Sequence, residues 1–297
     1  MDTTIQEATA DAYGTSHIKR LRATKSEVQD RRDAIYAIVK VQQPMSVRQV
    51  FYQASVHGIV EKAESGYRKV QTDLTLMRRD GTLPYGWLAD STRWRSKPDS
   101  FNSAKQAVVE TARYYRKALW SDLDTYVEIW LEKDALAGVV YPVTALYDVP
   151  LMVARGYASL SFLHSAAEEI RSLRRRTYIY HLGDYDPSGV NAAEKIEETL
   201  KEMAPDDDIT FERIAVTPEQ IEAWDLPTRP TKKSDTRSKG FGDVSVELDA
   251  IPPDRLRELV TSVLELHLPA DQLETLQAAE ASERQMLRGI AEMVGGR

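Results

Sequence analysis

The chain has 297 residues, of which 42% are hydrophobic and 29% charged, and it contains no cysteine. This composition is typical of a globular protein of one or two domains, and the lack of cysteine excludes disulfides, thiolate zinc sites and cysteine nucleophiles. No apolar run reaches the length of a membrane span, and the polar N-terminal residues lack the apolar core of a signal peptide. We therefore expect a cytoplasmic protein with no membrane partner.

The net charge of −7 hides an uneven distribution. Residues 1–120 contain 20 Lys and Arg against 13 Asp and Glu, a net charge of +7, whereas residues 121–297 contain 19 against 33, a net charge of −14. A basic first part joined to an acidic second part favours a nucleic-acid-binding module followed by a carboxylate-rich one. The alternative is an uneven surface charge that serves no partner.

The basic part begins with a polar arm, expected to be flexible over residues 1–18. Apolar periodicity and stop signals such as Pro44 and Gly58 then predict three helices, over residues 26–41, 47–57 and 67–79. Residues 82–88 have the composition of a short hairpin, so residues 19–89 are predicted to form a winged-helix domain. The last helix of such a domain usually enters the major groove. Its candidate DNA contacts are Arg68, Lys69, Arg78 and Arg79; the alternative is a solvated basic face.

Residues 90–120 are predicted to connect the basic module to the acidic one. Arg93 and Arg95 are further candidates for DNA contacts, and a helix is expected over residues 103–120. Basic side chains alternate there with Tyr114 and Tyr115, a pattern that suits tracking of a phosphate backbone. The two tyrosines could equally pack into an interface between domains.

From residue 121 the pattern changes to alternating strands and helices. Strands are predicted over 125–131, 149–153, 178–182 and 209–216, with helices over 133–141, 162–174 and 190–203. This alternation predicts a parallel sheet covered on both faces. A loop over 225–243, a short strand over 244–248 and helices over 252–267 and 270–294 complete the chain. The predicted fold class is thus α/β, preceded by an α+β domain.

Carboxylates follow two strands of this predicted sheet. Glu132 ends the first strand, and Asp184 and Asp186 follow the third. Adjacent parallel strands bring their C-terminal ends together, and three such carboxylates suit Mg²⁺, with Mn²⁺ as a possible substitute. The alternative for Asp184 and Asp186 is a turn with a helix cap and no metal. Glu128, inside the first strand, is interpreted as structural, or as a rival of Glu132 if the strand ends early.

At these residues the sequence resembles a known domain. The strand ending in Glu132-Lys133, the Arg155-Gly156-Tyr157 segment and the Gly183-Asp184-x-Asp186-Pro187-x-Gly189 turn are similar to the Toprim domain of type II topoisomerases and related nucleases. A winged helix followed by Toprim is the order in the topoisomerase VI A subunit and the meiotic double-strand-break transesterases. Their catalytic tyrosine lies on an Arg-x-hydrophobic-aromatic-Tyr motif, which here is matched by residues 48–52, RQVFY.

The resemblance implies specific roles. Tyr52 would be the nucleophile and Arg48 its partner, while Glu132, Asp184 and Asp186 would hold the metal within a Toprim domain over residues 121–297. The implied activity is Mg²⁺-dependent cleavage of both strands of DNA through a 5′-phosphotyrosyl link, in the manner of a type IIB topoisomerase A subunit associated with the nucleoid.

The resemblance also bears on assembly. It implies a homodimer on double-stranded DNA, in which the tyrosine of one subunit meets the metal site of the other. The chain contains no ATP-binding signature, so an ATPase would be a separate partner, and strand passage is not expected from this chain alone. A short, stand-alone member from a bacterium or mobile element is the best match.

The chemistry of Tyr52 and Arg48 supports these roles independently of the resemblance. A tyrosine phenol has a pKa near 10 and needs activation at neutral pH. Arg48 lies four residues before Tyr52, hence on the same helix face, where it could lower the phenol pKa or bind a phosphate. Three alternatives stay open: Tyr52 is a packed aromatic; the protein is a metal-dependent nuclease that activates water; or it is a DNA-binding factor without catalysis.

Overall fold

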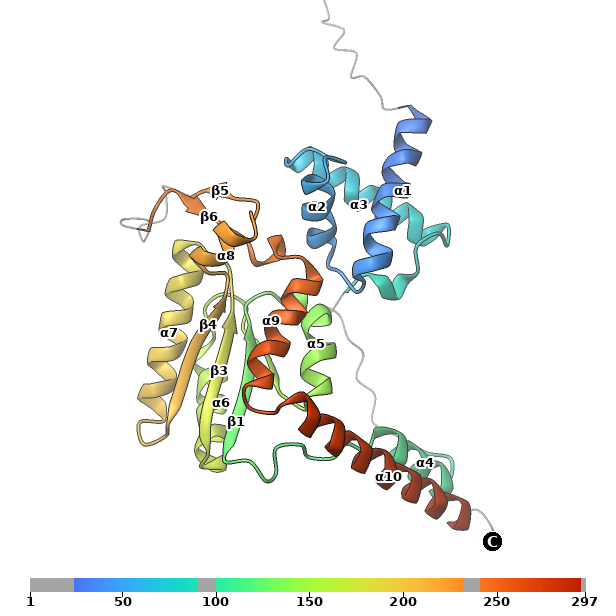
Figure 1. The fold of residues 1–297 in the computed structure, drawn as a ribbon, viewed down its shortest axis with the longest axis vertical. Helices are drawn as coiled ribbons and strands as arrows, with labels where there is room; N and C mark the ends of the chain where they lie inside the picture. The colour runs from blue at the N-terminus through green and yellow to red at the C-terminus, as the bar shows by residue number, and fades with distance from the viewer. Residues whose placement is uncertain (1–23, 90–99, 232–240, 295–297) are drawn as a thin grey trace, which may run out of the picture.

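The computed structural model describes residues 24–89, 100–231 and 241–294. Three parts are visible in Figure 1: a helical module near the N-terminus, an α/β module around a parallel sheet, and a pair of helices that projects away from the sheet. The arm expected over residues 1–18 lies outside the described residues. In the part of the chain that the structure describes, no helix is both long and apolar enough to cross a membrane.

The helical module contains the three predicted helices, α1 (Lys25–Gln42), α2 (Val47–Val56) and α3 (Glu64–Arg79). Both α1 and α2 begin with a capping box, in which a threonine or serine and a residue three positions later satisfy the first free amides. Asp73 of α3 is 2% exposed and accepts ion pairs from Arg31 and Arg32 of α1, at 2.6 and 3.0 Å. These pairs fix α3 against α1.

The hairpin predicted after α3 is wrong. Residues 85–87 instead form a short 3-10 turn, η1 (Tyr85–Trp87), and Leu88 makes only one isolated bridge, to Met45. The reason is apolar burial: Leu83 and Leu88 are buried, and the Trp87 ring packs 5.5 Å from that of Tyr36 on α1. These side chains pack directly on the helices, so the segment follows the helical surface and does not reverse on itself.

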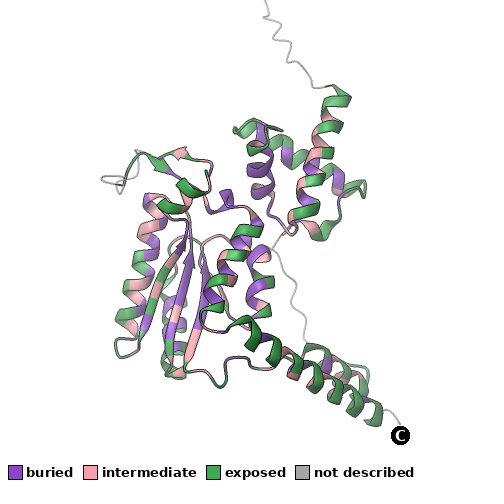
Figure 2. Cartoon of the chain, viewed as in Figure 1, coloured by how far each residue is buried: buried purple, intermediate pink, exposed green. Residues whose placement is uncertain are grey.

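The α/β module confirms the predicted parallel sheet. Its strands are β1 (Thr125–Leu131), β2 (Leu151–Val153), β3 (Arg176–Leu182) and β4 (Ile209–Ala215), all parallel in the order β2-β1-β3-β4. On one face lie α5 (Ala137–Leu146) and α9 (Pro253–Glu265), and on the other α6 (Leu160–Leu173) and α7 (Pro187–Met203). Burial is concentrated in the central strands and in the helix faces turned toward them (Figure 2).

The connector differs from its prediction. Its helix, α4 (Ala104–Tyr114), ends six residues early and packs along α10 (Ala270–Val294). Beyond that end, the Tyr115 hydroxyl donates to Glu283 of α10, and Lys117 forms an ion pair with the same carboxylate at 2.8 Å. Tyr115 therefore contacts α10, whereas Tyr114 is exposed, so the two tyrosines do not share one interface.

The region before α9 carries more structure than predicted. A short helix, α8 (Pro218–Ala223), precedes the expected loop, and β5 (Arg229–Pro230) pairs antiparallel with β6 (Val244–Ser245). Two 3-10 turns, η2 (Asp134–Leu136) and η4 (Leu248–Ala250), complete the described elements. The strand expected over 244–248 thus ends at Ser245.

The packing of α7 on the sheet predicts a large cost for Leu200→Ala. Leu200 is fully buried, and its truncation is expected to lower the free energy of unfolding by about 2–5 kcal/mol. Leu266→Ala is the matched control, because Leu266 is 74% exposed and should change stability by only about 0.5 kcal/mol. Urea unfolding of both variants measures the difference, and equal losses would contradict the packing described.

Candidate functional site

The C-terminal edge of the sheet brings two of the predicted carboxylates together. The backbone amide of Asp184, which follows β3, donates to Oε2 of Glu132, which follows β1, at 2.9 Å. The turn leaves little space: a Cβ on Gly183 would lie 2.6 Å from the same Glu132 oxygen. The predicted convergence of these two strand ends is confirmed.

Asp186 has a structural role at this turn. It is the N-cap of α7: its Oδ1 accepts from the amide of Gly189 at 2.8 Å, and Pro187 occupies the first turn. Its Oδ2 accepts an ion pair from Arg229 at 2.9 Å. The turn and helix cap of the alternative are therefore present at Asp186, and both of its oxygens have partners.

Lys133 lies at the centre of a cluster formed with the carboxylates of Asp184, Glu247 and Asp249, which we call the Lys133 cluster. Its ammonium is 3.0 Å from Oδ1 of Asp184, 2.8 Å from Oδ2 of Asp249 and 3.6 Å from Oε2 of Glu247. Burial alone would lower the Lys133 pKa, but the three carboxylates outweigh it and raise the pKa above its usual range. Lys133 is therefore a charged ammonium that holds three chain segments together.

Backbone hydrogen bonds fix the segment that carries Glu247 and Asp249. Tyr185, inside the Asp184 turn, exchanges two of them with Val246, at 2.8 and 2.9 Å, and the Leu248 amide donates to Oδ1 of Asp184 at 2.8 Å. This segment therefore lies directly against the turn, and Glu247 and Asp249 extend from it into the cluster.

The same segment anchors the helical module. The hydroxyl of Ser46, the N-cap of α2, donates to Oδ1 of Asp249 at 3.0 Å. In the first turn of α2, Arg48 forms an ion pair of 2.7 Å with Oε2 of Glu247, while its guanidinium lies 5.2 Å from the centre of the Tyr67 ring. The start of α2 is thereby fixed against the C-terminal edge of the sheet.

Tyr52 lies on this helix beside Glu247. Its side chain is only 6% exposed. Burial and the nearby Glu247 carboxylate raise the pKa of Tyr52 to about 12, although Arg48 and Lys133 oppose the shift. Arg48 and Tyr52 therefore share Glu247 as a partner, and Tyr52 is protonated at neutral pH.

The three predicted metal ligands fit a divalent cation in chemistry but not in their present arrangement. Burial raises the pKa of Glu132 and Asp184, and for Glu132 the neighbouring Asp184 carboxylate raises it further, which is the repulsion a cation would relieve. However, Lys133 and Arg229 already pair with Asp184 and Asp186. Within residues 24–89, 100–231 and 241–294, no three His, Asp or Glu side chains are arranged to hold a metal ion.

Glu128 has the structural role that the sequence suggested. It is buried inside β1, and its carboxylate accepts from the Trp130 indole at 2.6 Å and from the Tyr126 hydroxyl at 2.7 Å. Because β1 continues to Leu131, Glu128 does not replace Glu132 at the sheet edge.

The candidate DNA contacts on α3 divide between two surfaces. Arg68 and Lys69 are exposed and pair with nearby glutamates, and Arg79 is exposed at the end of the helix. Arg78 instead lines a cavity of about 410 Å³ together with Arg48 and Lys133. The structure thus brings Arg78 to the cluster. Arg93 and Arg95 lie outside the described residues.

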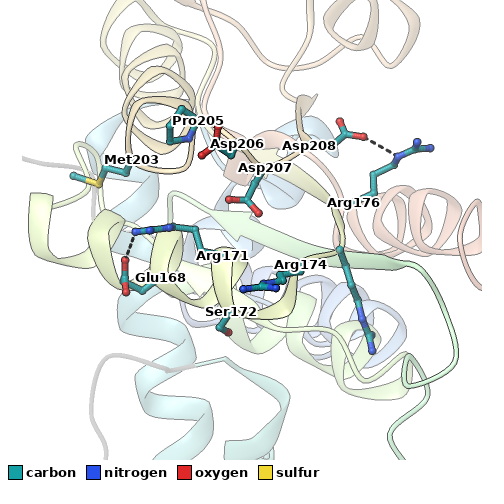
Figure 3. A pocket seen from close by; sticks show the side chains of 11 residues that line it. Glu168, Arg171, Ser172, Arg174, Arg176, Met203, Pro205, Asp206, Asp207 and Asp208 are labelled. Carbon is teal, nitrogen blue, oxygen red and sulfur yellow. Dashed lines mark hydrogen bonds and ion pairs between the residues drawn. The ribbon is translucent and has the colours of Figure 1, made fainter.

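A larger cavity, of about 930 Å³, lies at the opposite end of the sheet (Figure 3). Four of its charged side chains form two ion pairs: Arg171 with Glu168 at 2.7 Å, and Arg176 with Asp208 at 2.9 Å. Ligands of open parallel sheets bind at the C-terminal strand ends. We therefore place the functional site at the Lys133 cluster.

Sequence reasoning did not identify Lys133, Arg229, Glu247 and Asp249 as members of the site. The available signal was the spacing of Glu247 and Asp249, two residues apart after a short strand, which repeats the spacing of Asp184 and Asp186. No family model matches the chain, and a search of curated proteins finds no match either.

A buried histidine beneath the turn predicts a pH-dependent stability. Burial, with the neighbouring Arg213 charge, lowers the pKa of His181 to about 3. Below the ordinary histidine pKa of about 6.5 the unfolded chain gains a proton that the native state does not, so stability is lost as pH falls. Between about pH 7.5 and 5.5, wild type should lose about 1.4 kcal/mol more than His181→Phe in urea unfolding. Parallel pH profiles would contradict a neutral, buried His181.

Proposed function

We propose that the protein cleaves double-stranded DNA by transesterification, with Tyr52 as the nucleophile. The observation that carries this proposal is the shared carboxylate of Glu247. It is bound by Arg48 at 2.7 Å and by Lys133 at 3.6 Å, and its charge also acts on the phenol of Tyr52, four residues after Arg48 on α2. The Tyr52 phenol, two cations and the acidic sheet edge therefore lie close together within one chain, whereas the resemblance to the topoisomerase VI A subunit implies that the tyrosine meets the metal site of the other subunit.

The proposed reaction exchanges one phosphate ester bond of DNA for a phosphate ester bond to tyrosine. Oη of Tyr52 attacks phosphorus as the bond from phosphorus to the 3′ oxygen of the preceding nucleotide breaks, which leaves the 5′ phosphate on the tyrosine. The phenol loses a proton and the departing 3′ oxygen gains one, so charge and atoms balance. In this proposal Arg48 stabilises the negative charge of the phosphate.

We propose Mg²⁺, or Mn²⁺ in its place, as the cofactor, held by Glu132, Asp184 and Asp186. The oxygen donors suit a hard cation, which would neutralise charge at the phosphate. Binding requires Lys133 and Arg229 to leave Asp184 and Asp186, because each now forms an ion pair with one of these carboxylates.

The helical module is the proposed DNA-binding part of the chain. Arg68, Lys69, Arg78 and Arg79 of α3 are the described candidates for phosphate contacts, which carry most of the affinity of non-specific binding. We further propose a homodimer that places one tyrosine on each strand, acting without strand passage unless a separate ATPase joins it. Analytical ultracentrifugation that finds only the 33.6-kDa monomer on DNA would contradict the dimer.

Plasmid cleavage tests the reaction. In Mg²⁺ or Mn²⁺, wild type should produce linear or nicked DNA that enters a gel only after protease treatment. Tyr52→Phe removes the attacking oxygen and Asp184→Ala removes a metal ligand, so each should lower cleavage by about a thousandfold or more. EDTA should abolish it.

The same variants distinguish transesterification from hydrolysis of DNA by a metal-activated water. Glu168→Gln, at the far end of the sheet, is the control and should cleave like wild type. The deep burial of Tyr52 favours a metal-dependent nuclease that activates water as the second candidate. Cleavage that survives Tyr52→Phe, is lost in Asp184→Ala and leaves no DNA trapped on protein would replace the proposed function with that one.

A further inference from the structure

Three cations from three separate segments converge on the Glu247 carboxylate. Arg48 of α2 lies 2.7 Å and Lys133, after β1, lies 3.6 Å from Oε2, while Arg229 of β5 lies 3.5 Å from Oε1. We propose that these cations form a binding site for a DNA backbone phosphate, and that Glu247 occupies this site until DNA displaces it. The inference rests on the proposed function only in taking DNA as the ligand.

The chemistry of the three cations suits a phosphate. Two are guanidinium groups, whose planar set of donors matches the oxygens of carboxylates and phosphates alike, and the third is an ammonium, which binds either as a point charge. A carboxylate that contacts all three is therefore the part of the chain that most resembles a bound phosphodiester. Tyr52 follows Arg48 by four residues on α2, so a phosphate bound by Arg48 lies on the same helix face as the proposed nucleophile.

Donors without partners indicate a ligand with more oxygens than Glu247 has. Nε of Arg229, in the guanidinium that contacts Glu247, and Nε of Arg78 are both buried, and neither has a hydrogen-bond partner within the described part of the chain. Arg78 lines the cavity of about 410 Å³ that adjoins Arg48, Lys133 and Glu247. A cavity of this size accepts a nucleotide-sized ligand, and a phosphodiester offers four oxygens where a carboxylate offers two.

The backbone allows Glu247 to leave the site. Its two neighbours are fixed independently of its side chain: Val246 by paired hydrogen bonds to Tyr185, and Leu248 by its bond to Asp184. The Asp249 contacts with Ser46 and Lys133 also continue to hold α2 against the sheet when the Glu247 side chain rotates away. Displacement therefore needs only a rotamer change.

The test is equilibrium binding of a short labelled duplex, by fluorescence anisotropy in EDTA, to wild type, Glu247→Gln and Glu168→Gln. Glu247→Gln removes the competing charge and should bind about tenfold more tightly, with a steeper dependence on salt because additional cations reach phosphates. Glu168→Gln changes the net charge equally at the opposite end of the sheet and should bind within about twofold of wild type.

A second substitution assigns the gain to the site. Arg229→Gln combined with Glu247→Gln should remove most of the tenfold gain, because one of the freed cations is then missing. If Glu247→Gln does not fold, Glu247→Asp is measured instead; it withdraws the carboxylate by one methylene and should bind about threefold more tightly than wild type.

Affinity of Glu247→Gln equal to or below that of wild type, or an equal gain in Glu168→Gln, would overturn the proposal. A gain that persists without Arg229 would also overturn it, as would unchanged affinity of Glu247→Asp where that variant is the one measured. Because binding is read in EDTA, where no cleavage is expected, this result is independent of the proposed reaction. Failure of the proposed function would be seen in a different experiment, as plasmid cleavage that Tyr52→Phe does not change.

Discussion

The ion pairs of the half-buried Lys133 ammonium are the interactions on which the site depends. Asp184, Glu247 and Asp249 come from two segments far apart in the sequence, and without a cation between them their mutual repulsion and desolvation would oppose this packing. Lys133 can meet them because it follows Glu132 at the end of a central strand. Asp249 also accepts a hydrogen bond from the N-cap of α2, so Lys133 is linked through this carboxylate to the helical module.

The sequence predicts the sheet well and the site only in part. Alternating strands and helices indicate parallel neighbours, so the meeting of Glu132 and Asp184 at one edge could be predicted. The positions of Glu247 and Asp249 could not, because they depend on one antiparallel bridge between Tyr185 and Val246 that no local pattern reveals. The predicted hairpin failed for a related reason: the residues around Trp87 pack on helices, and turn composition alone does not include tertiary burial.

At the proposed active site, cations and carboxylates of the same chain neutralise each other. The cations that a phosphate would need are bound by Glu247, and the carboxylates that a metal ion would need are bound by Lys133 and Arg229. Tyr52 is kept protonated by burial and by Glu247. Phosphate and metal would therefore each replace an internal counterion of the same sign, which couples DNA binding to assembly of the site.

Mapping a covalent adduct tests the central claim most directly. The protein is incubated with a cleavable duplex and Mg²⁺, denatured, and digested with protease and nuclease, and the peptides are analysed by mass spectrometry. The account predicts a nucleotide joined through its 5′ phosphate to Tyr52. Cleaved DNA with free 5′ phosphates and no modified peptide, or an adduct on a different residue, would contradict it.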